Sequence, residues 1–448
     1  MKKILLLLTV LAITTDAALA QFSNKIQSMR PYDQTGINVF ETGKADSTPY
    51  DGLQLKLGAG FTQQFQSLKH ENPTATLNGY GQSNYLYPIS PGFMTAQANL
   101  FIDAQLYDGM RLNVTTYLSS RHHNETWVKG GFLQIDKLPF KGEIWDKLMS
   151  ITTIKAGHYE VNYGDMHFRR SDGGHTLQNP FMEGLILDAF ATEIGGDVLV
   201  QKNGFFGMIG LTGGAIKGNV DSVKSTTANP DAKKAPSIIF KAGFDRQMTA
   251  QLRVRVSGSW YNNSNAGNNT LTLYGGDRTG SNYQNAMEKY YTTVTPTPVT
   301  SAGTAIAFSG RVNPGFSQQV NSFMLNAFLK YSGFEFFGTY ESAKGRGPSE
   351  STDRSFDQYA IEGVYRFGPK ECVYVGARYN AASGRLAGTT FTDDVKINRF
   401  AAAAGWFITK NILMKAEYVE QKYEDFPTAD YRSGGKFNGI VIEAAVSF

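Results

Sequence analysis

Apolar and polar residues alternate one by one along several segments of this chain. The clearest segment is 94–107, whose apolar series is Met94, Ala96, Ala98, Leu100, Ile102, Ala104 and Leu106. Neighbouring side chains of a strand point to opposite faces, so this pattern predicts one face that is apolar over seven positions. A tilted strand needs about this length to cross a membrane. The pattern recurs in 252–260 and in 440–448.

Applied to the whole chain, this alternation predicts sixteen strands. They lie near 53–68, 93–107, 110–120, 126–137, 150–163, 185–201, 204–217, 236–245, 251–262, 320–331, 333–343, 355–367, 370–381, 394–408, 411–423 and 436–448. An even number of strands is what a closed antiparallel barrel with both ends in the periplasm requires.

The connections between these strands alternate in length, as in outer-membrane barrels with short periplasmic turns and long external loops. The predicted turns are 108–109, 202–203, 332–333, 368–369 and 409–410, and the predicted loops are 69–92, 164–184, 218–235, 263–319, 382–393 and 424–435. Two connections fit less well, since 121–125 is short for a loop and 138–149 is long for a turn, with 143–149 predicted as a helical turn in the periplasm. We therefore predict an all-β transmembrane antiparallel β-barrel of about sixteen strands. The alternative is a soluble β-sandwich or propeller, whose strands also have alternating apolar and polar residues.

The first residues have the pattern of a cleaved signal peptide. Lys2 and Lys3 precede an apolar run, and Ala18 and Ala20 stand where a signal peptidase recognises small residues, which predicts cleavage before Gln21. We expect 21–52 to be a periplasmic or lumen-docked extension and 53–448 to be the barrel. After residue 20 no stretch of about 18 apolar residues follows, so no transmembrane helix is predicted.

Composition agrees with a barrel. Aromatic residues make up 13% of the chain, Gly accounts for 47 of 448 residues and the mean hydropathy is −0.29. A barrel with a lipid-facing outside and a wet inside needs such an aromatic-rich but polar sequence. Cys372 is the single cysteine, which excludes a disulfide framework, and the net charge of +4 gives no indication of nucleic-acid binding.

Two segments resemble those of known porins. The last strand, 439–448, ends in Phe448 and resembles the terminal signal that the assembly machinery of Gram-negative outer-membrane proteins recognises. Residues 154–164 are similar to the strand that enters the third loop of the phosphate-selective (O/P-type) porins. This resemblance implies a porin whose third loop turns into the lumen.

The third external loop therefore holds the candidates for a pore constriction, which are His167, Arg169, Arg170 and His175. The adjacent guanidinium groups bring fixed positive charge, and Gly173 and Gly174 allow a sharp bend. Folded inward, this loop would narrow the lumen and favour anions. The alternative is an ordinary solvated surface loop.

Strand parity also assigns charged residues to the lumen wall. The cations are Lys155, Lys241, Arg253, Arg255, Arg366, Arg378 and Lys415, and the anions are Asp103, Glu193, Asp245, Glu335, Glu362, Glu417 and Glu443. This mixture implies either a transverse electric field or ion pairs that brace the barrel.

The sequence gives little support for catalysis or metal binding. His122, His123 and Glu125 share one short loop without the spacing of a metal site, and no Gly-x-Ser-x-Gly motif or convincing Ser/His pair is present. We expect no enzymatic activity, no cofactor and no metal.

The preferred interpretation is an outer-membrane porin that passes small solutes or ions by diffusion, because sixteen strands enclose a lumen too wide for wall side chains to fill. Its expected partners are outer-membrane lipid, the solutes and the barrel-assembly machinery, with a homotrimer as a candidate oligomer. A non-conducting structural barrel, plugged by 21–52 or by 263–319, and an uptake channel for hydrophobic compounds are the alternatives.

Overall fold

The computed structural model describes residues 26–46, 48–73, 86–94, 96–118, 126–170, 175–218, 220, 222–223, 233–277, 279–289 and 309–448. The predicted signal peptide, the loop residues His122 to Glu125 and the pair Gly173 and Gly174 lie outside the described residues. The cleavage site and the division of the chain at residues 20 and 52 therefore stay predictions.

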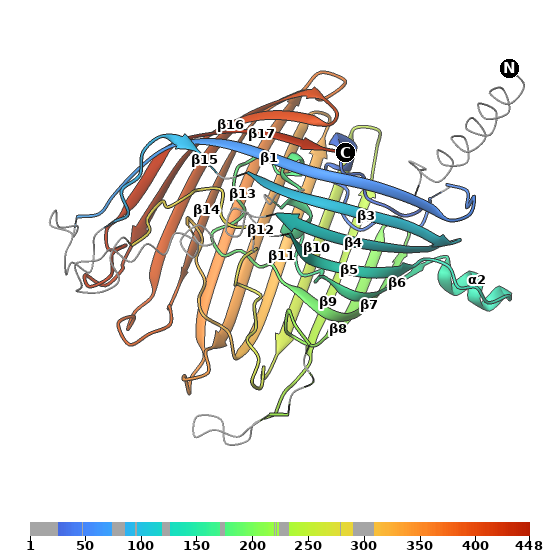
Figure 1. Cartoon of the computed structure of the whole chain (residues 1–448), viewed down its shortest axis with the longest axis horizontal. Helices are drawn as coiled ribbons and strands as arrows, with labels where there is room; N and C mark the ends of the chain where they lie inside the picture. The colour runs from blue at the N-terminus through green and yellow to red at the C-terminus, as the bar shows by residue number, and fades with distance from the viewer. Residues whose placement is uncertain are drawn as a thin grey trace, which may run out of the picture.

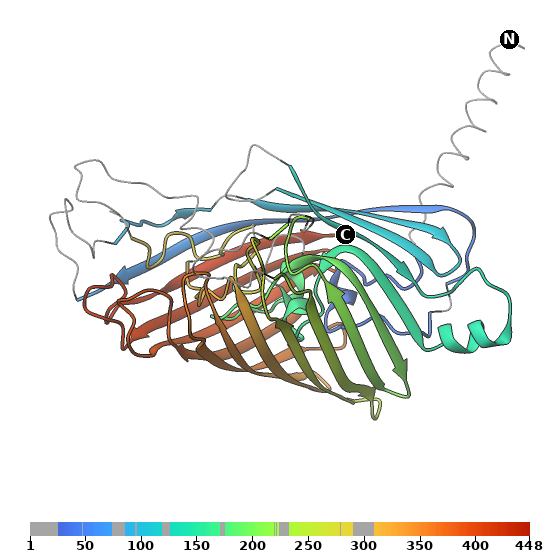
Figure 2. The ribbon, with the colours of Figure 1, turned by 90° about the horizontal axis from the view of Figure 1, so that it is seen from below.

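Within the described part of the chain, sixteen strands form one closed antiparallel ring, which confirms the predicted barrel (Figures 1 and 2). Each strand pairs with the next one in this order, and the last pairs with the first: β1 (Gln54–Glu71), β3 (Gln97–Tyr107), β4 (Met110–Leu118), β5 (Trp127–Ile135), β6 (Thr152–Glu160), β7 (Thr192–Lys202), β8 (Phe205–Thr212), β9 (Ser237–Gln247), β10 (Leu252–Asn263), β11 (Gln319–Tyr331), β12 (Phe334–Arg346), β13 (Arg354–Phe367), β14 (Val373–Gly384), β15 (Val395–Thr409), β16 (Ile412–Glu424) and β17 (Lys436–Ser447).

Two predicted strands differ most from the observed ones, and the strand predicted near 204–217 ends at Thr212. The segment predicted near 93–107 is divided into a short strand β2 (Gly92–Phe93), which pairs with β1, and β3. The strand predicted near 185–201 begins only at Thr192, because Leu185 to Ala191 leave the wall and fold into the lumen. Their apolar side chains face other protein atoms and not lipid.

The two faces of the barrel wall differ as alternation requires. Outward positions carry exposed apolar side chains, such as Leu100 of β3, Val256 of β10 and Ile440 of β17. Inward positions one residue away are polar and buried, such as Asp103 and Arg255. An apolar outside around a polar inside is the arrangement of a transmembrane barrel.

The short connections lie at the end of the barrel that also holds the start of β1 and the end of β17. The longest of them contains the helix α2 (Glu143–Met149), which projects beyond this end (Figure 1). The predicted helical turn is therefore present. No helix among the described residues is long and apolar enough to cross a membrane.

The ring closes between β1 and β17 in a continuous register from Gly60 opposite Ser447 to Glu71 opposite Lys436. Phe448 extends this ladder, since its amide donates to Ala59 O at 3.0 Å and its carbonyl accepts from Ala59 N at 3.1 Å. Gly58 lies beside this seam, and a Cβ on Gly58 would come within 2.7 Å of the ring of Tyr32. The extension therefore packs directly on the seam.

Three segments outside the wall fill much of the lumen. They are the extension before β1, the third loop between β6 and β7, and the loop between β10 and β11, which is described for 264–277, 279–289 and 309–318. Each carries side chains that are almost fully buried, including Phe40 in the first, Phe181 in the second and Tyr283 in the third. Wall side chains alone would not fill a ring of sixteen strands.

Candidate functional site

The charged wall residues assigned by parity lie inside the barrel, and most are ion-paired. The pairs are Lys241 with Asp165 (2.8 Å) and Glu41 (3.0 Å), Arg253 with Asp245 (2.7 Å), Arg255 with Asp165 (2.7 Å) and Glu41 (2.8 Å), Arg366 with Glu335 (2.9 Å), Arg378 with Glu362 (2.8 Å) and Lys415 with Glu443 (2.9 Å). Glu417 accepts hydrogen bonds from Tyr283 and from the Met182 amide. Of the two readings of the mixed charge, these contacts fit ion pairs that brace the barrel.

Among the wall cations assigned by parity, Lys155 is the exception within the described structure, since its electrostatic partner, Asp197, forms no direct ion pair with it. Its ammonium lies 4.9 Å from the ring centroid of Phe132 and 5.4 Å from that of Tyr159, and Asp197 of β7 stands opposite it in the ladder. The ring contacts are cation-π interactions, which stabilise a charge without neutralising it.

The extension contributes a carboxylate that joins several of these groups. Glu41 lies between Lys241 and Arg255, and it also accepts a hydrogen bond from Asn162 at 3.1 Å. The two cations outweigh the desolvation of this buried carboxyl and lower the pKa of Glu41 to about 2. The same cations hold the pKa of Asp165 far below its ordinary value. Both groups are carboxylates at neutral pH and fix the extension to the third loop and the wall.

The third loop folds inward, and its two arginines are neutralised there. Arg169 is paired with Glu362 of β13 at 2.9 Å, and Arg170 with Asp188 at 2.5 Å. Each guanidinium also lies over a ring, Phe337 for Arg169 and Phe190 for Arg170. These contacts remove the free positive charge on which the expected anion constriction depends.

The two histidines of this loop lie against open space in the lumen. His167 is 2.8 Å from Asn162 Oδ1 and 3.4 Å from Glu160. Burial lowers the pKa of His167, so its ring is neutral at neutral pH. His175 lies 5.6 Å from the ring of Phe101. The sequence therefore placed both pairs of candidates in one loop, and of these four residues the histidines line two of the five cavities described below.

The loop between β10 and β11 packs against the third loop through charge. Arg311 is paired with Glu183 at 2.5 Å and with Asp188 at 3.0 Å. Arg311 and the backbone amides around Glu183 lower the pKa of Glu183 to about 2. Arg399 of β15 donates to Gly184 O and to Gly310 O, so one wall residue holds both loops.

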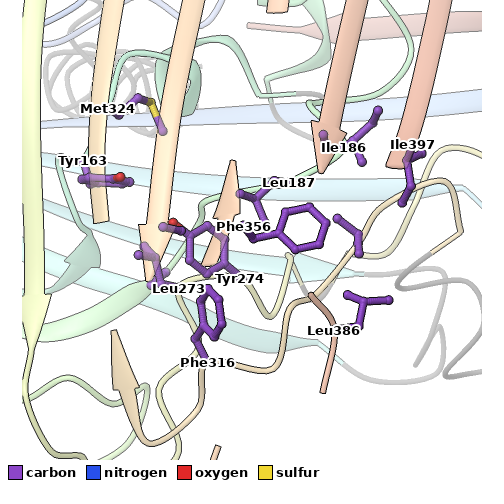
Figure 3. Close-up of a cluster of buried hydrophobic side chains, with 14 of the residues drawn as sticks. Tyr163, Ile186, Leu187, Leu273, Tyr274, Phe316, Met324, Phe356, Leu386 and Ile397 are labelled. Atoms are coloured by element: carbon purple, nitrogen blue, oxygen red, sulfur yellow. The ribbon is translucent and has the colours of Figure 1, made fainter. Parts of the chain in front are cut away.

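A hydrophobic cluster supports this charged layer. Ile186 and Leu187 of the third loop meet Tyr274 and Phe316 of the other inward loop and Phe356 of the wall (Figure 3). Apolar burial of this kind is typical of a protein interior and not of a wide aqueous channel. The lumen on this side of the barrel is therefore packed.

The opposite side of the lumen, along β3 to β8, retains cavities. From the loop end inward, they are an outer cavity of about 300 Å³ that includes Tyr117, Val128 and Asp277, a middle cavity of about 190 Å³ that includes Asn99 and Phe101, and an inner cavity of about 170 Å³ that includes Lys155 and Asp197. A mouth cavity of about 550 Å³ and a second cavity of about 640 Å³, beside α2, follow at the periplasmic end.

Neighbouring cavities share lining residues, so each adjoins the next. Lys129, His158 and Thr192 border both the outer and the middle cavity. Arg30, Arg111, Phe132 and Glu160 border both the middle and the inner cavity, and Glu41 borders the inner cavity and the mouth cavity. We call this off-centre series of cavities the passage. His175 lines the middle cavity and His167 the inner one, whereas Arg169 and Arg170 line none of the five.

Several residues that line the passage were not predicted from the sequence. Arg30 and Glu41 lie in the extension, and Glu160 stands at the last position of β6. The position of Glu160 next to the third loop could have identified it as a candidate. Nothing in the local pattern of 26–52 indicated which residues Arg30 and Glu41 contact. Among the described residues no group of three or more His, Cys, Asp and Glu side chains is arranged to hold a metal ion.

Comparison with known proteins gives similarity at the level of fold. No protein-family model and no curated protein sequence matches the chain. A loop-deletion mutant of OmpT, an outer membrane protein of Vibrio cholerae, is 11% identical over 89% of this chain and 100% of its own, with a TM-score of 0.48. An anion-selective porin from Comamonas acidovorans is 10% identical over 88% of this chain and 100% of its own, with a TM-score of 0.49.

The outer membrane channel DcaP of Acinetobacter baumannii is likewise 10% identical over 89% of this chain and 99% of its own, with a TM-score of 0.47. These solved structures are outer-membrane proteins, and they include porins and channels. At such low identity the likeness concerns the barrel alone. Membership of the phosphate-selective porin family stays a prediction from the two sequence segments.

Proposed function

We propose that the chain is an outer-membrane channel that passes small polar solutes or ions through the passage along β3 to β8. The observation that carries this proposal is the asymmetry of the lumen: one side is packed with ion pairs and apolar side chains, and the other retains successive cavities bordered by both charged and apolar side chains. A bracing structure would have no need for charged groups beside open space, because unneutralised buried charge is costly.

The width of the passage sets the size of what moves. Adjoining cavities of about 170 to 300 Å³ suit solutes of a few heavy atoms and not large molecules. Movements of Lys129, Arg111 or Glu41 would connect neighbouring cavities. We also propose that passage groups such as Arg30 and Lys155 set the ion preference in place of Arg169 and Arg170.

The test is single-channel conductance with a reagent that blocks the passage. In a Cys372→Ser background, Thr115→Cys places a thiol on the wall of the middle cavity, and Thr116→Cys places one at the adjacent, outward position. A charged, water-soluble methanethiosulfonate should lower the conductance of the first variant and leave the second unchanged. A conducting wild type whose two variants respond equally would contradict this path.

A non-conducting structural barrel is the second candidate, and the density of the lumen favours it. Side chains such as Arg311, Glu183 and Phe356 are at most 6% exposed although they lie inside the ring. A complete absence of conductance from correctly folded wild-type protein would support this candidate.

The remaining proposals concern the protein's place in the cell. We propose that the chain is exported, is cleaved before Gln21, is inserted by the barrel-assembly machinery and forms a homotrimer in the outer membrane. Fractionation with N-terminal sequencing tests the first two points, and crosslinking in native membranes tests the oligomer.

A further inference from the structure

The junction of the middle and inner cavities holds two opposite charges, Arg30 and Glu160, that attract each other electrostatically but form no direct ion pair within the described structure. Arg30 of the extension donates to Gly36 O at 3.0 Å and to Phe168 O at 2.8 Å, and it makes no ion pair within the described structure. Burial lowers the pKa of Arg30 to about 9, which leaves its guanidinium charged at neutral pH. The guanidinium also lies 5.7 Å from the ring centroid of Phe168, and Glu160 and Glu41 attract it electrostatically. A buried cation without a direct ion pair retains the capacity to bind an anion.

Glu160 supplies the opposite charge at the same junction. Its side chain is 26% exposed inside the lumen, and His167, which is neutral at neutral pH, lies 3.4 Å from its Oε1. Arg170 and Lys129 also attract this carboxylate electrostatically. Glu160 Oε1 has no hydrogen-bond donor among the described residues. The carboxylate therefore retains the capacity to bind an ammonium group.

The middle cavity has a further unused polar group. Asn99 is 2% exposed, and neither its amide nitrogen nor its amide oxygen has a hydrogen-bond partner among the described residues. Burying such a group without a partner is unfavourable. Since Asn99 lines the middle cavity, a polar molecule bound there would supply the missing partner after a small movement of the side chain.

Aromatic rings form the remaining walls of this space. The ring of Tyr32 stacks on that of Phe101 with 4.1 Å between centroids, and Phe132 borders both cavities. Gly130 lines the middle cavity, and a Cβ there would lie 2.5 Å from His158 O. The wall is thus apolar between a fixed cation, a fixed anion and an amide.

We propose that this junction is a binding site for small zwitterions of the α-amino acid type, which rests on the channel function proposed above and names its solute class. The carboxylate of the solute binds Arg30, its ammonium group binds Glu160, and its side chain lies toward Phe101 and Phe132 near the amide of Asn99. A zwitterion neutralises both Arg30 and Glu160 at once, whereas a simple anion or cation neutralises only one of them.

Calorimetric titration of the detergent-folded protein with L-alanine tests this site, because binding requires no open channel. Wild type should bind alanine saturably, and Arg30→Gln and Glu160→Gln should each weaken binding at least about tenfold, as expected for a lost charge-assisted hydrogen bond. Lactate, which lacks the ammonium group, should bind more weakly to wild type and should be insensitive to Glu160→Gln. Lys330→Gln, which removes a cation far from the junction, is the matched control.

The results separate this inference from the channel proposal. Absent alanine binding, binding unchanged in both variants, or equal affinity for lactate and alanine would each overturn the zwitterion site. Absent conductance with intact alanine binding would overturn the channel and leave the site. Heat-modifiable mobility in gels verifies that each variant is folded. If Arg30→Gln does not fold, the binding measured with Glu160→Gln still tests the site.

Discussion

Arg169 of the third loop and Glu362 of β13 form a buried ion pair with 2.9 Å between Nη2 and Oε1, and each side chain is at most 3% exposed. Glu362 also accepts from Arg378 at 2.8 Å, so one carboxylate holds a loop cation and a wall cation. The loop that was expected to present free positive charge to the solute is thus attached to the wall by that charge.

Replacing Arg169 should therefore affect stability more than selectivity. Arg169→Met should lower the free energy of unfolding by about 3 kcal/mol, since it leaves a buried carboxylate with one partner fewer. Lys396→Met, which removes an exposed pair with Asp425, should leave the free energy of unfolding nearly unchanged. Urea titration in detergent measures both. A shifted reversal potential in Arg169→Met, with unchanged stability, would contradict this prediction and show that the third loop determines ion selectivity.

Gly58 should tolerate no larger side chain. Gly58→Val would place Cβ within 2.8 Å of both the Tyr32 ring and Phe448 O, and overpacking of this kind costs about 1 to 3 kcal/mol. Gly43→Val, in the same part of the chain, has open space around its Cβ and serves as the control. The fraction of heat-modifiable barrel should fall in the first variant alone. Equal fractions would show that the extension does not pack on the seam.

The terminal residue should be required for efficient closure. Deleting Phe448 removes two backbone hydrogen bonds to Ala59, in addition to the residue that the assembly machinery is expected to recognise. The folded yield at low expression should fall, and refolding from urea without any cellular machinery should also slow. A defect confined to cells would assign the role of Phe448 to recognition alone.

Much of the barrel could be predicted from sequence because lipid and water impose opposite demands on alternate residues. In 252–263 the alternation is continuous, and the predicted and observed strands differ by one residue at each end. The error at 185–191 has the same origin, since Ile186 and Leu187 are as apolar inside the lumen as they would be toward lipid. Alternation with period two therefore shows that a side chain faces an apolar environment, but it does not show whether that environment is lipid or protein.

The contents of the lumen were harder to predict. Glu41 binds residues about 200 positions away in β9 and β10, and Arg30 meets a loop more than 130 positions away. Such contacts depend on how a closed ring places its strands, which no local pattern encodes. Parity identified the wall charges but could not tell which of them the inward segments neutralise.

Cysteine labelling distinguishes position in the wall from accessibility. Arg253 is partly exposed near the periplasmic end, Val254 points outward, and Arg255 is 1% exposed beneath Glu41. In a Cys372→Ser background, a water-soluble maleimide should label Arg253→Cys readily and Val254→Cys hardly at all. Arg255→Cys should react slowly until the extension is released by Glu41→Gln. Rapid labelling of all three positions would contradict the register of β10.

The contribution of Glu41 to stability should depend on pH. Its folded-state pKa of about 2 lies below the ordinary value of 4.5, so its stabilising effect is complete above pH about 5 and is lost as pH falls from there through 2. Thermal unfolding should show Glu41→Gln less stable than wild type at pH 7 and nearly equal to it at pH 2. Equal stability at pH 7 would contradict the buried ion pairs. Asp46→Asn, at a more exposed site of the same segment, is the control.

The contacts of the extension cross the seam of the barrel from the inside. Tyr32 donates to Asp103 on β3, while the Gln34 amide donates to Lys410 O in the turn before β16, so three consecutive residues hold the strands on both sides of the closing pair β1 and β17. These contacts are complete only when the strands on both sides of the seam are in place. Residues 32–34 therefore add a second attachment across the seam to the backbone hydrogen bonds between β1 and β17. A finished barrel is consequently harder to open sideways into the bilayer than the ladder of one strand pair would make it.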